Sequence, residues 1–194
     1  MRVEYADLEA APAVLLVAFE PEDESPIVFL RLRKASASGT RVFSLGSGAS
    51  RGLSKMNGTL IPAMPGDEAS ALADLPAEIR EALAAPGAVI MMGERVASAP
   101  GACAAAGALA QETGAALAWV PRRAGERGAL DAGALAGLLP GGRPIDDPLA
   151  RQQSADAWGV DPSSLPQRGL SGDALLASLR SGARRAALVG GVEA

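Results

Sequence analysis

Three short stretches of uninterrupted apolar residues are the clearest pattern in the chain. They are residues 13–18, 88–92 and 186–189. Each run is continuous rather than alternating, which is typical of a strand covered on both faces of a parallel sheet. Weaker strand patterns occupy residues 41–45, 59–61 and 115–120. The sequence therefore predicts a mostly parallel sheet between layers of helices.

Helical patterns separate these predicted strands. The first begins at Ser25-Pro26, with serine as N-cap and proline in the first turn, and ends at Gly39. Its expected apolar stripe consists of Ile27, Leu30 and Lys34-Ala35. Further helices are expected at residues 99–113, closed by Gly114, and at residues 173–180. Because strand, helix and strand recur as in βαβ units, we expect an α/β fold with a three-layer, Rossmann-like open sheet and helices on both faces.

Residues 137–170 differ from the rest of the chain because glycine and proline are frequent there. One short helix is expected at residues 148–158, with Asp146-Asp147 as its N-terminal cap. We interpret this region as an irregular excursion over the surface of a single α/β domain that spans residues 1–194.

The composition excludes several kinds of chemistry. The chain has no histidine, one cysteine (Cys103), and 22 acidic against 18 basic residues, for a net charge of −4. Such a chain cannot supply a Ser-His-Asp triad, a Cys-His dyad, a His-ligated zinc site or a four-cysteine iron–sulfur site. We therefore expect no catalytic residue and no metal ligand. The acidic balance also argues against nucleic-acid binding.

No apolar run approaches the ~20 residues of a membrane-spanning helix, and no signal-peptide pattern opens the chain. The expected setting is the cytoplasm, without direct insertion into a membrane.

Acidic residues follow the carboxyl ends of three predicted strands. They are Glu20, Glu94 and Glu193. Ligands of open α/β sheets bind at this edge, where carboxylates are poorly suited to holding a phosphate.

The acidic cluster after the first strand comprises Glu20, Glu22, Asp23 and Glu24. It could act as a metal or general-base cluster, or it could stabilise the positive end of the helix that begins near Ser25. The second interpretation is favoured.

A glycine-rich segment, residues 46–52, follows a predicted strand and resembles a dinucleotide-binding fingerprint. Its third glycine, Gly52, stands one place too late, and Gly58 and Pro62 leave little room for the required helix. A glycine-rich connection is the favoured interpretation. Ser47 is the residue of this segment that would contact a phosphate.

Three arginines gather just after the last of the weaker strands. They are Arg122, Arg123 and Arg127. They could hold an anion, or they could pair with acidic residues of the chain and with a partner subunit. We favour pairing or interface use. The expected interface residues are thus Glu20, Glu22, Asp23, Arg122, Arg123 and Arg127.

The remaining reactive or aromatic side chains have simpler interpretations. Cys103 lies among alanines without a basic neighbour, so we expect a buried, inert thiol. Trp119 and Trp158 are expected to be packing residues.

Four stretches of the sequence carry a resemblance to a known family. They are residues 14–35, 51–62, 119–129 and 138–142. The first resembles the xxPxExxPxxxxRxRKA stretch of molybdopterin-oxidoreductase-type domains. Together they resemble the large iron–sulfur subunit of bacterial proton-pumping NADH–quinone oxidoreductase, respiratory complex I, in its actinobacterial form. The resemblance covers essentially the whole chain.

The resemblance implies an internal piece of a longer subunit whose iron–sulfur clusters are bound elsewhere. It implies a non-catalytic scaffold domain in the peripheral arm, on the cytoplasmic side of the inner membrane, in contact with other subunits and with other domains of the same subunit. NADH oxidation, quinone reduction and proton translocation would belong to the whole complex. No cofactor would be bound by this chain.

Two alternatives belong to other classes. The chain could be the pterin/guanine-dinucleotide-binding domain of a molybdopterin oxidoreductase, with Ser47, Arg122 and Arg123 near the phosphates. It could also be a free-standing nucleotide-binding module.

Overall fold

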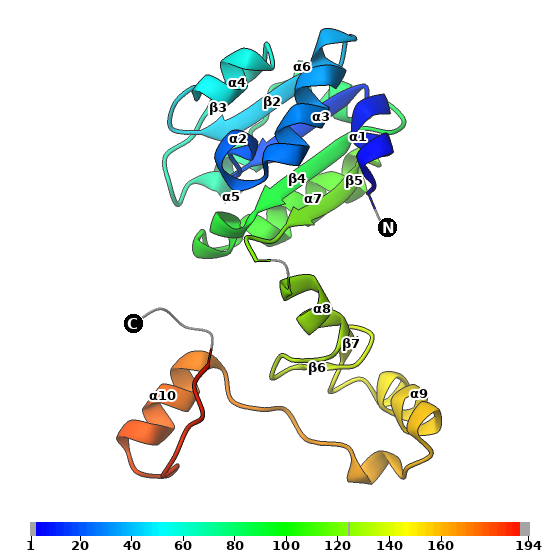
Figure 1. The fold of residues 1–194 in the computed structure, drawn as a ribbon, viewed down its shortest axis with the longest axis vertical. Coiled ribbons are helices and arrows are strands. Elements are labelled where there is room, and N and C mark those ends of the chain that lie inside the picture. The colour runs from blue at the N-terminus through cyan, green and yellow to red at the C-terminus, as the bar shows by residue number, and fades with distance from the viewer. Residues whose placement is uncertain (1–2, 124, 191–194) are drawn as a thin grey trace. The chain divides into compact units, whose positions relative to one another are not determined.

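The computed structural model describes residues 3–123 and 125–190, which belong to two compact units, Met1–Arg122 and Arg123–Ala194. The large sheet lies in the first unit (Figure 1). A single domain over residues 1–194, with an excursion at 137–170, stays a prediction.

The first unit is built on five parallel strands in the order β3-β2-β1-β4-β5. Their bounds are β1 Ala13–Val17, β2 Arg41–Gly46, β3 Thr59–Pro62, β4 Val89–Gly93 and β5 Ala116–Val120. In the centre of the sheet, Val14 of β1 pairs with Val42 on one side and with Val89 on the other. All residues of β1 and β4 are buried. The prediction from continuous apolar runs is confirmed for both strands.

Side chains of β1 alternate between two hydrophobic cores. Leu15 belongs to the core on one face of the sheet, and Leu16 belongs to the core on the other face. The first core also contains residues of α5 Glu68–Ala73, α6 Ala77–Leu83 and α7 Ala102–Thr113. The second contains residues of α1 Tyr5–Ala10 and α3 Pro26–Ala37 and of the segment around α4 Arg51–Lys55. The predicted three-layer, Rossmann-like architecture is confirmed.

Helix α3 confirms the predicted helix but corrects its buried face. Ile27 and Leu30, which we expected in the apolar stripe, are half exposed, whereas Val28, Phe29 and Leu32 are buried. Ala35, the remaining apolar residue of the expected stripe, is buried as predicted, and the whole buried set follows an i, i+1, i+4, i+7 spacing. Pro26 occupies the first turn as predicted, but the Ser25 side chain makes no capping hydrogen bond.

Two short helices flank the predicted ones. The acidic residues before α3 form a helix of their own, α2 Pro21–Glu24. A 3-10 helix, η1 Glu94–Ser98, follows β4, so that α7 starts later than expected. Gly114 ends α7 in the left-handed conformation with φ 77°, as glycine at a helix C-terminus commonly does.

Cys103 is exposed on α7, so the prediction of a buried thiol is wrong. Ala102 and Ala106 form the face of the helix that is buried against the sheet, and Cys103, one residue along, projects from another face. Trp119 packs against the core as expected, whereas Trp158 is largely exposed, contrary to prediction.

The second unit consists of short elements around a small core. Their bounds are α8 Glu126–Asp131, β6 Leu138–Leu139, β7 Arg143–Pro144, α9 Pro148–Trp158, η2 Pro162–Ser164 and α10 Gly172–Arg180. The core consists of Leu139, Ile145, Ala155 and Leu165. Asp147 caps α9, as predicted, by accepting a hydrogen bond from the Leu149 amide at 3.0 Å.

Residues 186–189, predicted as a buried strand, are exposed and have no regular secondary structure. Leu188 and Val189 retain 103% and 68% of their accessible surface. No strand in the described part of the chain pairs with this run, and an unpaired run of four residues cannot satisfy its backbone as a strand does. Glu193 lies outside the described residues.

Among residues 3–123 and 125–190, no helix is long and apolar enough to cross a membrane.

Candidate functional site

A crevice of the first unit lies at the carboxyl ends of its strands. It has a volume of about 670 Å³, and its walls come from the segments that follow β1, β2, β3 and β4. Since β1 lies between β2 and β4, connections leave the sheet centre in opposite directions at this point. Such a switch point is where open α/β sheets bind ligands.

The turn after β1 brings a carboxylate into the crevice. Ala18 has a positive φ of 48°, after which Phe19 is buried in the core and Glu20 lines the crevice. The Glu20 side chain accepts a hydrogen bond from the Glu22 amide at 3.2 Å and so caps α2. Glu20 therefore serves the N-terminus of α2, not that of the helix that begins near Ser25, for which we expected it from the sequence.

Glu20 also fills the space in front of the glycine-rich segment. A Cβ atom on Gly52 would lie 2.3 Å from Glu20 Oε1, whereas Gly46 and Gly48 have open space where a Cβ would be. Gly52 therefore accommodates a carboxylate of the same chain. In dinucleotide-binding sites the comparable glycines let the backbone approach a phosphate.

The crevice lining carries more acidic than basic groups. Glu20, Asp23 and Glu68 line it, and Arg95 is the basic residue among its lining. Arg95 is engaged with a carboxylate, because its Nη2 lies 2.8 Å from Glu24 Oε1. The lining residues thus do not fit a group with several phosphates, which needs unpaired cations or converging amide donors.

Another acidic residue of the cluster pairs with the helix after the glycine-rich segment. Glu22 forms an ion pair with Lys55 of α4. Ser47, the candidate for contacting a phosphate, lines the crevice on an exposed part of the segment after β2. Ser50 instead caps α4, where its Oγ accepts a hydrogen bond from the Leu53 amide at 2.8 Å.

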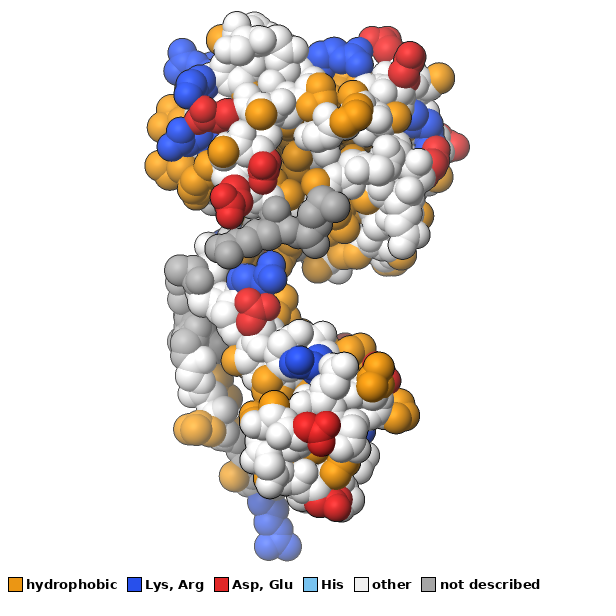
Figure 2. Space-filling model, turned by 90° about the vertical axis from the view of Figure 1, so that its right-hand side faces the viewer, with side chains coloured by type: hydrophobic (Ala, Val, Ile, Leu, Met, Phe, Trp, Pro, Cys, Tyr) orange, Lys and Arg blue, Asp and Glu red, His pale blue; other side chains and the backbone are white. Residues whose placement is uncertain are grey.

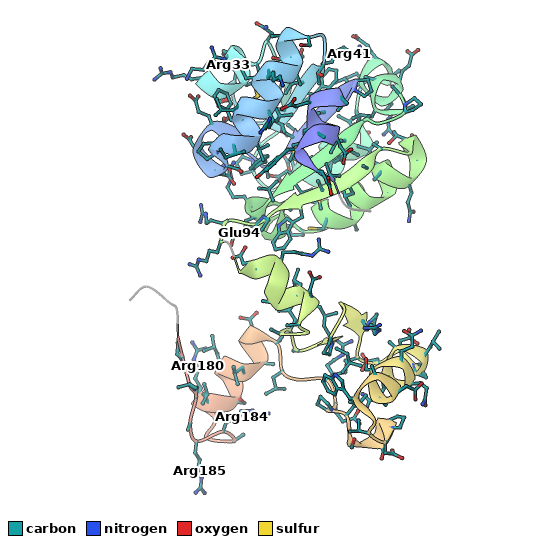
Figure 3. All side chains as sticks on the ribbon, turned by 45° about the vertical axis from the view of Figure 1, so that its right-hand side comes forward. Arg33, Arg41, Glu94, Arg180, Arg184 and Arg185 are labelled. Atoms are coloured by element: carbon teal, nitrogen blue, oxygen red, sulfur yellow. The ribbon has the colours of Figure 1, made fainter. Side chains whose placement is uncertain are left out.

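The three arginines after β5 are divided between the two units. Arg122 ends the first unit, with its Nε 3.7 Å from Glu94 Oε2, whereas Arg123 and Arg127 belong to the second. Arg127 pairs with Asp131 at 3.0 Å within α8. Figure 3 labels Glu94, which directly follows β4 at the carboxyl-end edge of the sheet. Use of the arginines and the acidic cluster as an interface stays a prediction.

The polar lining residues that sequence reasoning missed include Glu68, Arg95 and Ser98. Arg95 and Ser98 belong to η1, directly after β4, so the rule that ligand sites follow the carboxyl ends of strands could have found them. Glu68 begins α5 after a longer connection from β3, and no local pattern marks it.

The charged side chains are otherwise dispersed. Figure 2 shows basic and acidic side chains interspersed on the visible face of the first unit. No three Cys, Asp or Glu side chains of the described residues are arranged to hold a metal ion.

The strand order and the crevice define the class of the first unit. It is an open, Rossmann-like α/β domain with acidic residues at the carboxyl ends of its strands. The chain is 56% identical over its whole length to the G subunit of NADH-quinone oxidoreductase from Mycobacterium tuberculosis and to that from Mycobacterium bovis. It is 50% identical over 98% of its length to the G subunit of NADH-quinone oxidoreductase from Streptomyces coelicolor. The predicted resemblance is thus confirmed: the chain is homologous to a segment of this G subunit.

The chain spans about a quarter of the length of these relatives, 24% in each case. No protein-family model matches it.

Proposed function

We propose that the chain is a non-catalytic scaffold domain within the G subunit of an NADH–quinone oxidoreductase. The observation that carries this proposal is the position of the Glu20 carboxylate against Gly52. Where a Rossmann-like site would hold phosphate, this chain holds a negative charge of its own. The reaction, electron transfer from NADH to quinone coupled to proton translocation, would take place in the rest of the complex.

Several features support a structural role. Two ion pairs near the crevice, Glu24–Arg95 and Glu22–Lys55, are formed within the chain. The single cysteine, Cys103, cannot complete an iron–sulfur site by itself. The clusters would therefore be bound by other parts of the G subunit. In this proposal the partners are those other parts and the remaining subunits of the peripheral arm, on the cytoplasmic side of the membrane.

The test is to obstruct the crevice in the assembled complex. Gly48 lines the crevice and has open space where its Cβ would lie, so Gly48→Trp adds a bulky side chain to the lining without displacing the core. We expect the NADH–quinone reductase turnover per assembled complex to stay unchanged. Gly48→Ser is the matched control. A tenfold loss of turnover in a normally assembled Gly48→Trp complex would show that the crevice takes part in the reaction.

The alternative is a pterin/guanine-dinucleotide-binding domain. The volume of about 670 Å³ and the position at the switch point favour it, and Ser47 of the lining would be a phosphate contact. Arg122 and Arg123, the other phosphate contacts expected from the sequence, are not among the residues that line this crevice. Thermal unfolding with and without millimolar guanosine diphosphate separates the two proposals. The scaffold proposal expects no change in Tm, whereas a rise of several degrees would favour the alternative.

A further inference from the structure

Helix α10 and the apolar run that follows it expose side chains that are buried in comparable elements of the first unit. None of the residues of α10 is buried, and Leu175 and Leu176 retain 37% and 51% of their accessible surface. The run at residues 186–189 is exposed throughout. Apolar side chains exposed together on adjoining elements mark an interaction site.

The leucines of α10 repeat the spacing of a helix that covers a sheet. Leu175, Leu176 and Leu179 follow the i, i+1, i+4 pattern. In α3, residues Val28, Phe29 and Leu32 have the same spacing and are packed in the core on one face of the sheet. The pattern of α10 is therefore suited to covering a β-sheet.

The link from α10 to the run also matches a helix-to-strand connection of this chain. Residues 181–185 separate them, a link of the same length as residues 84–88 between α6 and β4. A glycine, Gly190, directly follows the run, and β4 likewise ends in a glycine, Gly93. Its sequence, Ala-Ala-Leu-Val, has the continuous apolar character of β1 and β4.

The relatives indicate what can cover these elements. Each relative aligns with this chain and extends over about three-quarters of its own length beyond the alignment. Because a helix followed by a strand is half of a βαβ unit, the matching partner is the edge of a parallel sheet. In the sequence, Arg180, Arg184 and Arg185 (labelled in Figure 3) lie between the leucines of α10 and the apolar run, so a partner edge bearing carboxylates fits best.

We propose that α10 and residues 186–189 dock together onto a parallel sheet formed by the part of the G subunit outside this chain. Residues 186–189 pair there as an added edge strand, and the leucine face of α10 covers one face of that sheet. This inference rests on the proposed function only in that the chain operates inside the G subunit.

Amide hydrogen exchange tests the proposal in the complete G subunit, with the 194-residue chain alone as reference. We expect amides of residues 186–190 and of α10 to exchange at least about tenfold more slowly in the complete protein. Equal rates in the two proteins would overturn the proposal. Slow exchange in the reference chain as well would also overturn it, because the chain would then cover these elements by itself.

A substitution separates docking from general stability. In the complete G subunit, Leu188→Asp should restore fast exchange in residues 186–190 and leave the amides of β1 and β4 protected. Leu170→Asp, at an exposed leucine before α10, is the matched control and should change neither. If Leu188→Asp lowers expression, Leu176→Ser on α10 serves in its place. Slow exchange that persists in either docking variant would contradict the proposal.

The test is independent of the scaffold role. A crevice variant that lowers turnover would contradict the scaffold proposal and leave the expected exchange rates unchanged.

Discussion

A Cβ atom placed on Gly93 would lie 2.5 Å from the carbonyl oxygen of Ala18. Gly93 is the last residue of β4 and Ala18 directly follows β1, its neighbour in the sheet, and the backbones meet there without room for a side chain. Since the nearest atom belongs to the backbone, a rotamer change cannot relieve the contact.

Gly93→Ala should therefore destabilise the first unit by about 1–3 kcal/mol, the usual cost of overpacking. Gly48→Ala is the matched control, because a Cβ at Gly48 meets open space. Urea unfolding followed by Trp119 fluorescence in a Trp158→Phe background measures the change. Equal unfolding midpoints for the two variants would show that the strand ends separate easily.

Leu32 and Leu30 lie two residues apart on α3, one fully buried and the other 54% exposed. Leu32→Ala should lower the free energy of unfolding by about 2–5 kcal/mol, because it leaves a cavity between helix and sheet. Leu30→Ala should cost less than about 0.5 kcal/mol. The same fluorescence measurement compares the two variants. A larger loss of stability in Leu30→Ala than in Leu32→Ala would contradict the observed burial and favour the apolar stripe predicted from the sequence.

Glu9 joins α1 to α3 by accepting hydrogen bonds from Lys34, with its Oε2 2.6 Å from Nζ, and from Arg31. These hydrogen bonds lower the pKa of the Glu9 carboxyl below its ordinary value of 4.5. Its contribution to stability is therefore present above pH 4.5 and is lost as the pH falls through the lower pKa of the folded state.

Glu9→Gln should accordingly lower the unfolding midpoint at pH 7, and the difference from the unaltered chain should shrink as the pH falls below 4.5. Urea unfolding at a series of pH values measures it. Glu81→Gln, at an exposed carboxylate of α6, controls for the loss of one surface charge. A difference that grows toward acid would contradict the sign of the shift.

Arg151 holds the second unit together through backbone carbonyls. Its Nη1 donates to Ile145 and Pro166 at 3.2 and 2.9 Å, and its Nη2 donates to Pro162 and Leu165 at 2.9 and 3.0 Å. Lysine has one ammonium group and cannot reach four carbonyls. Arg151→Lys should thus destabilise this unit by roughly 1.5–3 kcal/mol.

Amide exchange in residues 145–166 would measure the loss, with Arg185→Lys as the control at an exposed arginine. Unchanged exchange in Arg151→Lys would assign the stability of the unit to its small apolar core alone.

The sequence correctly predicted those strands whose apolar runs pair with other strands of the same chain. The continuous runs around Leu15 and Ile90 are buried because β1 and β4 are covered on both faces. The run at 186–189 has the same local character, yet strand formation requires a neighbouring edge, which no local pattern reveals. Burial on α3 was mispredicted for a related reason, since Ile27 and Val28 differ in direction rather than in hydrophobicity.

The candidate site was predicted in part. The rule for the carboxyl ends of strands located Glu20, whereas the argument from the late third glycine against a phosphate loop stays a prediction. The contact between Glu20 and Gly52 could not be predicted, because it joins two loops that only the finished sheet brings together. The position of Glu68 in the crevice lining could not be predicted for the same reason, because only the folded sheet brings α5 close to the turn after β1.

The pairing of Val14 with Val89 has a consequence for how the chain reaches its native state. β1 is synthesised before the other strands of this sheet, and it can pair with β2 soon after β2 has been made. Its other edge stays unpaired until β4 has been synthesised, and most of the first unit lies between β1 and β4 in the sequence. Because such distant pairings slow folding, the central strand stays half paired while the intervening helices form. The most buried strand of the sheet therefore exposes an unpaired edge to wrong partners during folding.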